Sequence, residues 1–140
     1  MKYNFLSAKY LYDKGLIEDS KNICNKILEN EQNNIEVIDL IIQINIKLSL
    51  FKEALKYSQK AVNLKSDYIL YYKHSFILYV LNNTNEALEY INKSIKINEK
   101  FAESYNLRGL IFLKLNKGKK TLEDLTKAIS LKNNYHEAYF

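Results

Sequence analysis

The sequence predicts an all-α protein built from repeated antiparallel helix pairs. It has no proline and three glycines among 140 residues, so the tight turns of a β-sandwich or barrel have few residues to form them. Apolar residues recur at helical spacing, and related segments recur every 33 or 34 residues. The apolar content of 47% and charged content of 26% are typical of a folded globular chain.

Three segments of the chain align with one another. They are KEALKYSQKAVNLKSDY at 52–68, NEALEYINKSIKINEKF at 85–101 and KKTLEDLTKAISLKNNY at 119–135. A weaker copy fits at the start of the chain. A single array is therefore predicted over 1–140, with repeats at 1–34, 35–67, 68–101 and 102–135 and the start of a fifth at 136–140.

Each repeat is predicted to contain two helices. Within 85–98, apolar residues form one stripe at helical spacing, whereas 103–115 is apolar on more than one side and so should contact several neighbours. Polar turns at 82–85 and 116–118 separate first from second helices. Asn134 followed by Glu137 is typical of a helix start and predicts a break before the fifth repeat.

Small residues occupy the same positions in most of the repeats, with Ile42 and Ile27 as the large exceptions. The first helices carry one such column, made of Ala8, Ile42, Ser75 and Gly109. The second helices carry two, made of Ser20, Ala54, Ala87 and Thr121, and of Ile27, Ala61, Ser94 and Ala128. Small side chains let paired helices approach closely, so these columns mark the crossing points of each pair.

This pattern resembles the tetratricopeptide repeat (TPR) family in its period, its small columns and its aromatic residue near each repeat start (Tyr71, Tyr105 and Tyr139). The chain departs from the family by lacking the proline that closes each repeat. The resemblance implies a right-handed α-solenoid of about four TPR units, with first helices along the concave face. It also implies a non-catalytic module that binds a peptide or helix of a partner protein, as an adaptor or scaffold.

The repeat columns then predict which residues line the concave groove. They are Phe5, Lys9, Tyr12, Gln43, Ile46, Tyr72, Phe76, Tyr79, Asn106 and Leu110. The third repeat supplies the most aromatic part, and aromatic anchors dominate the binding energy of many protein interfaces. The alternative is that these rings pack on neighbouring helices as core.

Two further functions are consistent with the sequence. A completed fifth repeat would cover Leu122, Leu125 and Ile129, so end-to-end self-association through this C-terminal face is one alternative. The other is that the chain is a regulatory fragment of a larger protein.

The sequence offers no support for catalysis, a cofactor or a metal. One cysteine, Cys24, excludes an intramolecular disulfide, and with His74 and His136 it forms no zinc-ligand spacing. The segment 116–120 lacks the second glycine and the Ser or Thr of a phosphate-binding loop. Cys24 and His74 are predicted to be packing residues.

The net charge of +5 comes largely from one region, in which Lys114, Lys117, Lys119 and Lys120 surround a turn. This cluster is predicted to be solvated, with an acidic partner as the alternative. Nucleic-acid binding is disfavoured because the aromatic stripe lies in another repeat. The absence of a signal peptide or a spanning apolar run predicts a cytoplasmic protein without membrane insertion.

Overall fold

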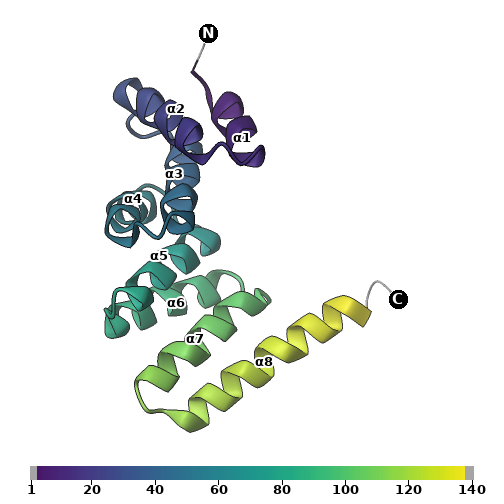
Figure 1. Ribbon diagram of the computed structural model, residues 1–140. Coiled ribbons are helices and arrows are strands. Elements are labelled where there is room, and N and C mark those ends of the chain that lie inside the picture. Colours follow the sequence, from purple (N-terminus) through teal and green to yellow (C-terminus); the bar gives the residue numbers. More distant parts are fainter. Residues whose placement is uncertain (1–2, 138–140) are drawn as a thin grey trace. The chain divides into compact units, whose positions relative to one another are not determined.

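The structure is a computed structural model that describes the backbone of residues 3–137 and the side chains of 3–133. That range contains eight helices and no strand (Figure 1). The helices are α1 (Phe5–Asp13), α2 (Ile17–Asn30), α3 (Ile35–Lys47), α4 (Phe51–Leu64), α5 (Tyr68–Val80), α6 (Thr84–Ile97), α7 (Ala102–Lys114) and α8 (Gly118–Glu137).

The chain divides into two compact units, each made of four helices. The N-terminal unit (Met1–Ser66) holds α1–α4 and the C-terminal unit (Asp67–Phe140) holds α5–α8. Within each unit every helix packs on the next, and the two first helices also touch, α1 with α3 and α5 with α7. The predicted all-α solenoid of helix pairs is confirmed.

The turn inside each repeat closes in the same way. The residue that ends it has a positive φ angle, 83° at Gly15, 59° at Ser49, 65° at Asn82 and 58° at Asn116. The next amide donates to the carbonyl five residues back, as in the Asn83–Leu78 bond of 2.8 Å. This Schellman closure satisfies carbonyls that the helix end leaves open. The other three are Leu16–Leu11, Leu50–Asn45 and Lys117–Phe112.

The predicted small columns lie at the helix crossings, and all twelve residues are buried. Where one member of a crossing is alanine, the other can be serine. The Ser20 hydroxyl donates to the Ala8 carbonyl at 2.7 Å, and the Ser75 hydroxyl donates to the Ala87 carbonyl at 2.6 Å. The serine lies on the second helix in the α1–α2 pair and on the first helix in the α5–α6 pair. In both pairs its hydroxyl makes a hydrogen bond between the two helices.

Large apolar residues fill the space beside the crossings. In the N-terminal unit a buried cluster joins α1, α2 and α3, and its members are Ala8, Cys24, Ile27, Val37, Leu40, Ile41 and Ile44. In the C-terminal unit Ile77, Ile91 and Ile111 are fully buried on α5, α6 and α7. The stability of each unit comes from packing between helices that are neighbours in the sequence.

The α7–α8 pair is held by a glycine and by an ion pair. A Cβ atom at Gly109 would lie 2.9 Å from Leu125 Cδ2, so glycine permits this close approach. The chain's single arginine, Arg108, donates from Nε and Nη2 to the two carboxylate oxygens of buried Asp124, both at 2.8 Å. Such a bidentate pair fixes the orientation of the two helices.

The break predicted before the fifth repeat is absent. Helix α8 runs for 20 residues from Gly118 to Glu137, past the position where the equivalent α6 ends after 14. Asn134 therefore lies inside a helix and does not begin one. No proline or glycine follows Gly118 to stop the helix. Residues 138–140, which include Tyr139, lie outside the described residues.

Candidate protein-interaction surface

In the C-terminal unit, the contacting helices α5 and α7 present an apolar and aromatic surface. Tyr72, Phe76 and Tyr79 of α5 are half-buried, so each packs on the fold and keeps part of its ring accessible. On α7, Leu110 is 36% exposed and Leu113 is 59% exposed. Partly exposed rings on α5 and exposed leucines on the contacting helix α7 are side chains suited to an apolar partner.

Phe101 holds the Tyr72 end of this surface. Its ring contacts Tyr72 edge to face at 5.4 Å between ring centroids, and Tyr68 in the same way at 5.2 Å. Burial raises the pKa of the Tyr72 phenol, and the nearby Glu103 carboxylate raises it further. The Tyr72 phenol is therefore neutral at neutral pH, and its ring is held in place by Phe101.

Lys114 holds the Tyr79 end. Its ammonium lies 4.3 Å from the centre of the Tyr79 ring, within cation–π range. The same nitrogen donates to Asn82 Oδ1 at 2.7 Å and to the Tyr79 carbonyl at 3.3 Å. Lys114 is exposed, as predicted for the cluster, and it also ties α7 to the turn after α5. Lys117, Lys119 and Lys120 are likewise exposed.

In the N-terminal unit, a hollow of about 140 Å³ lies between α1 and α3. Three predicted groove residues, Phe5, Lys9 and Gln43, line it together with Glu36, Asp39 and Leu40. It combines carboxylates, one ammonium and two apolar walls, so it suits a small polar side chain better than a large ring.

The other predicted residues of this unit lie beside the hollow. Tyr12 is half-buried against the core cluster, and the ammonium groups of Lys9 and Lys47 lie 5.3 and 5.4 Å from its ring centre. Ile46 is half-buried on α3. In the C-terminal unit, Asn106 is exposed on α7. Phe5, Lys9, Tyr12, Gln43 and Ile46 thus belong to the N-terminal unit, and the other predicted groove residues belong to the C-terminal unit.

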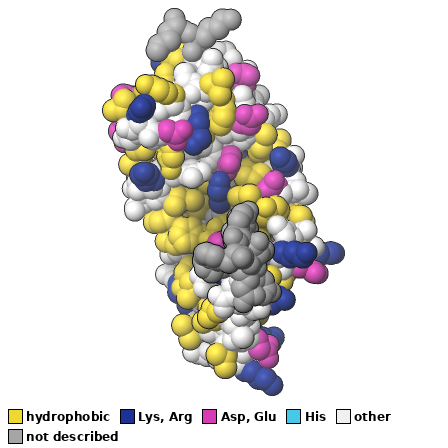
Figure 2. Space-filling view, turned by 90° about the vertical axis from the view of Figure 1, so that its right-hand side faces the viewer, with side chains coloured by type: hydrophobic (Ala, Val, Ile, Leu, Met, Phe, Trp, Pro, Cys, Tyr) yellow, Lys and Arg dark blue, Asp and Glu magenta, His cyan; other side chains and the backbone are white. Residues whose placement is uncertain are grey.

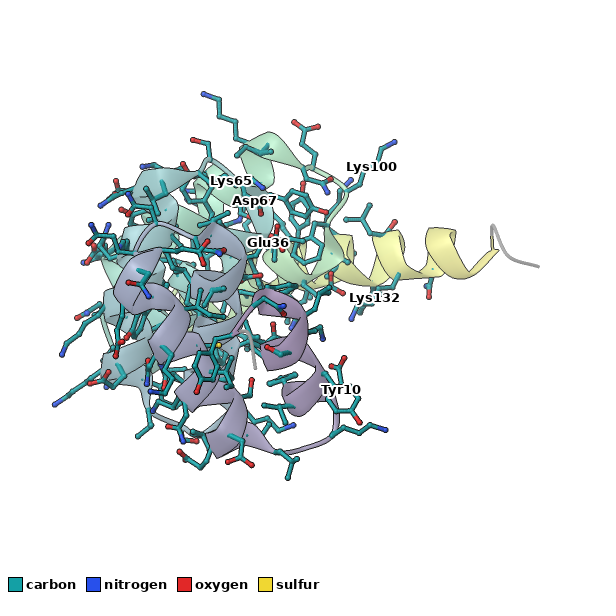
Figure 3. All side chains as sticks on the ribbon, turned by 90° about the horizontal axis from the view of Figure 1, so that it is seen from above. Tyr10, Glu36, Lys65, Asp67, Lys100 and Lys132 are labelled. Carbon is teal, nitrogen blue, oxygen red and sulfur yellow. The ribbon has the colours of Figure 1, made fainter. Side chains whose placement is uncertain are left out.

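Phe101, which directly precedes α7, was not predicted from the sequence. The available signal was Tyr68, the aromatic residue that occupies the same column one repeat earlier, at the start of α5. Phe101 also borders a hollow of about 320 Å³ between the start of α7 and the C-terminal part of α8. Lys100 and Lys132 flank this hollow, one from each side (Figure 3).

Cys24 and His74 are packing residues, as predicted. Cys24 is buried, and burial raises the pKa of its thiol to about 11, so the nucleophilic thiolate is scarce at neutral pH. His74 is also buried, with its ring 4.4 Å from that of Tyr90, edge to face. Burial lowers its pKa to about 4, so the imidazole is neutral.

Within residues 3–133, no group of three or more His, Cys, Asp or Glu side chains could hold a metal ion. None of the described helices has the length and apolar character needed to cross a bilayer. On the face drawn in Figure 2, Lys and Arg side chains are interspersed with Asp and Glu among hydrophobic ones. That face carries no broad field of one sign of charge.

Comparison with known proteins gives matches in both sequence and structure. The family model for the tetratricopeptide repeat matches residues 69–101 and 102–135. A TPR repeat-containing protein of Methanocaldococcus jannaschii is 33% identical over 138 residues, a match that covers 92% of this chain. The chain spans 24% of the length of that relative.

Solved structures of MamA share the fold. One crystal structure of MamA has a TM-score of 0.85 at 22% identity and covers 94% of this chain and 78% of that one. Residues 41 to the end of MamA from Desulfovibrio magneticus give a TM-score of 0.86 at 16% identity, over 93% and 74% of the two chains. With this period, fold and sequence match, the chain belongs to the tetratricopeptide repeat family.

Proposed function

We propose that this chain is an adaptor or scaffold whose first helices bind an apolar segment of a partner protein. The observation that carries the proposal is the surface of α5 and α7, where α5 carries half-buried rings and the contacting α7 carries exposed leucines. Rigid aromatic side chains lose little conformational freedom on binding, so they favour affinity. The partner segment is a peptide or one face of a helix.

The hollow of the N-terminal unit supports a second, more polar point of contact. Phe5, Lys9 and Gln43 line it with the exposed carboxylate of Glu36. A partner side chain that carries an amide or a positive charge would match these groups. This point supplies specificity, while the α5–α7 surface supplies most of the affinity.

The test is a pull-down with the wild-type chain and with Tyr72→Ala/Phe76→Ala/Tyr79→Ala. Retained proteins are identified, and the affinity of the partner for both baits is measured by calorimetry. A partner bound by the wild type and lost by the variant supports the proposal. Equal retention by both baits contradicts it.

Alanine at half-buried rings also weakens packing, so a surface variant is needed as well. Leu110→Ser/Leu113→Ser changes exposed residues of the same surface, and Ile97→Ser is the matched control because Ile97 is 51% exposed at the end of α6. The double variant should lose the partner while its thermal melt stays close to that of the wild type. The control should retain the partner.

End-to-end assembly is the second candidate, and the exposure of Leu122 and Ile129 on α8 favours it. The third, a regulatory segment of a larger protein, is tested by the length of the gene's open reading frame.

A further inference from the structure

The contact of α6 with α7 shows which side of a first helix faces the preceding repeat. The Ser104 hydroxyl on α7 shares a hydrogen bond of 2.9 Å with that of Ser94 on α6. Ser104, Leu107 and Ile111 stand on this side of α7 and are no more than 3% exposed. The same columns of α3 hold Val37, Leu40 and Ile44, which are no more than 5% exposed and share the core cluster with α2.

On α1, the same columns are exposed. Within the helix they hold Leu6 and Tyr10, whose exposed fractions are 75% and 61%, and the third column falls on Tyr3, which precedes α1 and is 48% exposed. Figure 3 shows Tyr10 projecting outward from α1. No described helix buries Leu6 or Tyr10, so two large apolar side chains of α1 are exposed where the other first helices bury theirs.

The contact of α6 with α7 also identifies the matching side of a second helix. Arg108 Nη1 on α7 donates to Asn92 Oδ1 at 3.0 Å, so the side of α6 that carries Asn92 faces α7. Leu88 and Ile95 flank Asn92 on this side and are half-buried. On α8 the equivalent positions are Leu122 and Ile129, which are 68% and 61% exposed.

The exposed sides of α1 and α8 are thus the two complementary halves of a contact that the chain already makes twice, between α2 and α3 and between α6 and α7. We propose that a second copy of this chain completes it, with α1 of one molecule seated on α8 of another, head to tail. Such a heterologous contact leaves a free half at each end, so more than two copies can join. It is independent of the groove on α5 and α7.

The charges at the turn ends fit this arrangement. Lys114, the last residue of α7, reaches Asn82 in the turn before α6. Asp13 is the last residue of α1 and so occupies the position that Lys114 has on α7. If α1 sits on α8 of another copy as α7 sits on α6, Asp13 lies at the turn before that α8, next to Lys117. The Asp13 side chain is 57% exposed and its carboxylate bonds Lys9 at 2.7 Å. An acidic group therefore meets a lysine-rich turn across the contact.

The test is sedimentation velocity over about 10 μM to 1 mM. The wild-type mass should rise with concentration beyond that of a dimer. Leu6→Glu/Tyr10→Glu and Leu122→Glu/Ile129→Glu should each weaken association more than about tenfold, because each places charge in one half of an apolar contact. Ile97→Glu, at a comparably exposed apolar residue, should associate like the wild type.

Mixing the two double variants gives the decisive result. Each keeps the half that the other lacks, so an equimolar mixture should form a one-to-one dimer that does not grow further. A wild-type chain that stays monomeric at the highest concentration would overturn the proposal. So would a double variant that associates like the wild type, since that result indicates a symmetric contact through one face.

Two controls separate folding and groove effects from the contact. Circular dichroism melts of the glutamate variants should match the wild type, since all four residues are more than half exposed. The groove variant Tyr72→Ala/Phe76→Ala/Tyr79→Ala should still assemble. Loss of assembly in this variant, with its fold intact, would place the contact on α5 and contradict the proposal.

Discussion

At the scale of single residues, equivalent positions of the repeats hold similar residue types, and two residues differ from the type that their position favours. Ser49 has a φ of 59° in a column otherwise held by Gly15, Asn82 and Asn116, residues that tolerate the left-handed region better. Asn45 is fully buried, and neither atom of its amide has a hydrogen-bond partner among the described residues. Both are sites where substitution should raise stability.

Ser49→Gly should increase the free energy of unfolding by about 1 kcal/mol, because glycine adopts positive φ without steric cost. The measurement is urea denaturation followed by circular dichroism. Ser130→Gly, at an exposed position inside α8, is the matched control and should lose about 0.5 kcal/mol. If both variants lose stability, the turn does not require a left-handed residue.

Asn45→Leu should increase the free energy of unfolding by about 1–3 kcal/mol, because it removes a buried amide without partners. The reciprocal change is Leu78→Asn, in the same column and 2% exposed, which should cost about 2–5 kcal/mol. Thermal and urea denaturation measure both. A less stable Asn45→Leu protein would show that the amide has a bonding role.

At the scale of helices, the sequence predicted local features better than long-range ones. The turns at 82–85 and 116–118 and the small columns were predicted because each depends on residues close together along the chain or on helical spacing. The end of α8 was missed because a capping pattern at Asn134 competes with helix propagation. The contacts of Phe101 and Lys114 were missed because they join residues about one repeat or more apart.

The α5–α6 pair should lose stability as the pH falls, because of His74. Burial lowers its pKa from 6.5 to about 4 in the folded chain. Between these pH values the unfolded chain binds a proton that the folded chain does not, so acid favours unfolding. The loss should approach about 3 kcal/mol between pH 6.5 and 4.

The measurement is urea denaturation at a series of pH values, with His74→Leu as the comparison. The variant should show a flatter dependence on pH over this window, whatever its stability at pH 7. Parallel pH curves for the two proteins would show that other groups, such as carboxylates, cause the loss.

At the scale of the molecule, the net charge of +5 and the apolar surfaces are separate features. Lys117, Lys119 and Lys120 are exposed around the turn before α8. The proposed groove lies on α5 and α7, where Tyr72, Phe76 and Leu113 supply apolar contact. Charge should therefore influence assembly through α8 more than it influences partner binding.

Lys117→Glu/Lys119→Glu/Lys120→Glu separates these features. The affinity of the groove for its partner should change less than about threefold, because long-range charge acts mainly on encounter rate. Head-to-tail assembly should weaken, because Asp13 then meets like charge. Calorimetry and sedimentation velocity measure the two. Loss of the partner in this variant would indicate an acidic ligand and argue against an apolar groove.

The chain tolerates changes of length in some places and not in others. The second repeat is one residue short, and the structure places the difference in the connector 65–67, against four residues in 31–34 and in 98–101. The Schellman turns inside the repeats keep one length throughout. A residue added within such a turn would rotate the following helix by about 100°, turning its apolar stripe away from its neighbours. Natural length variation and inserted tags therefore belong in the connectors.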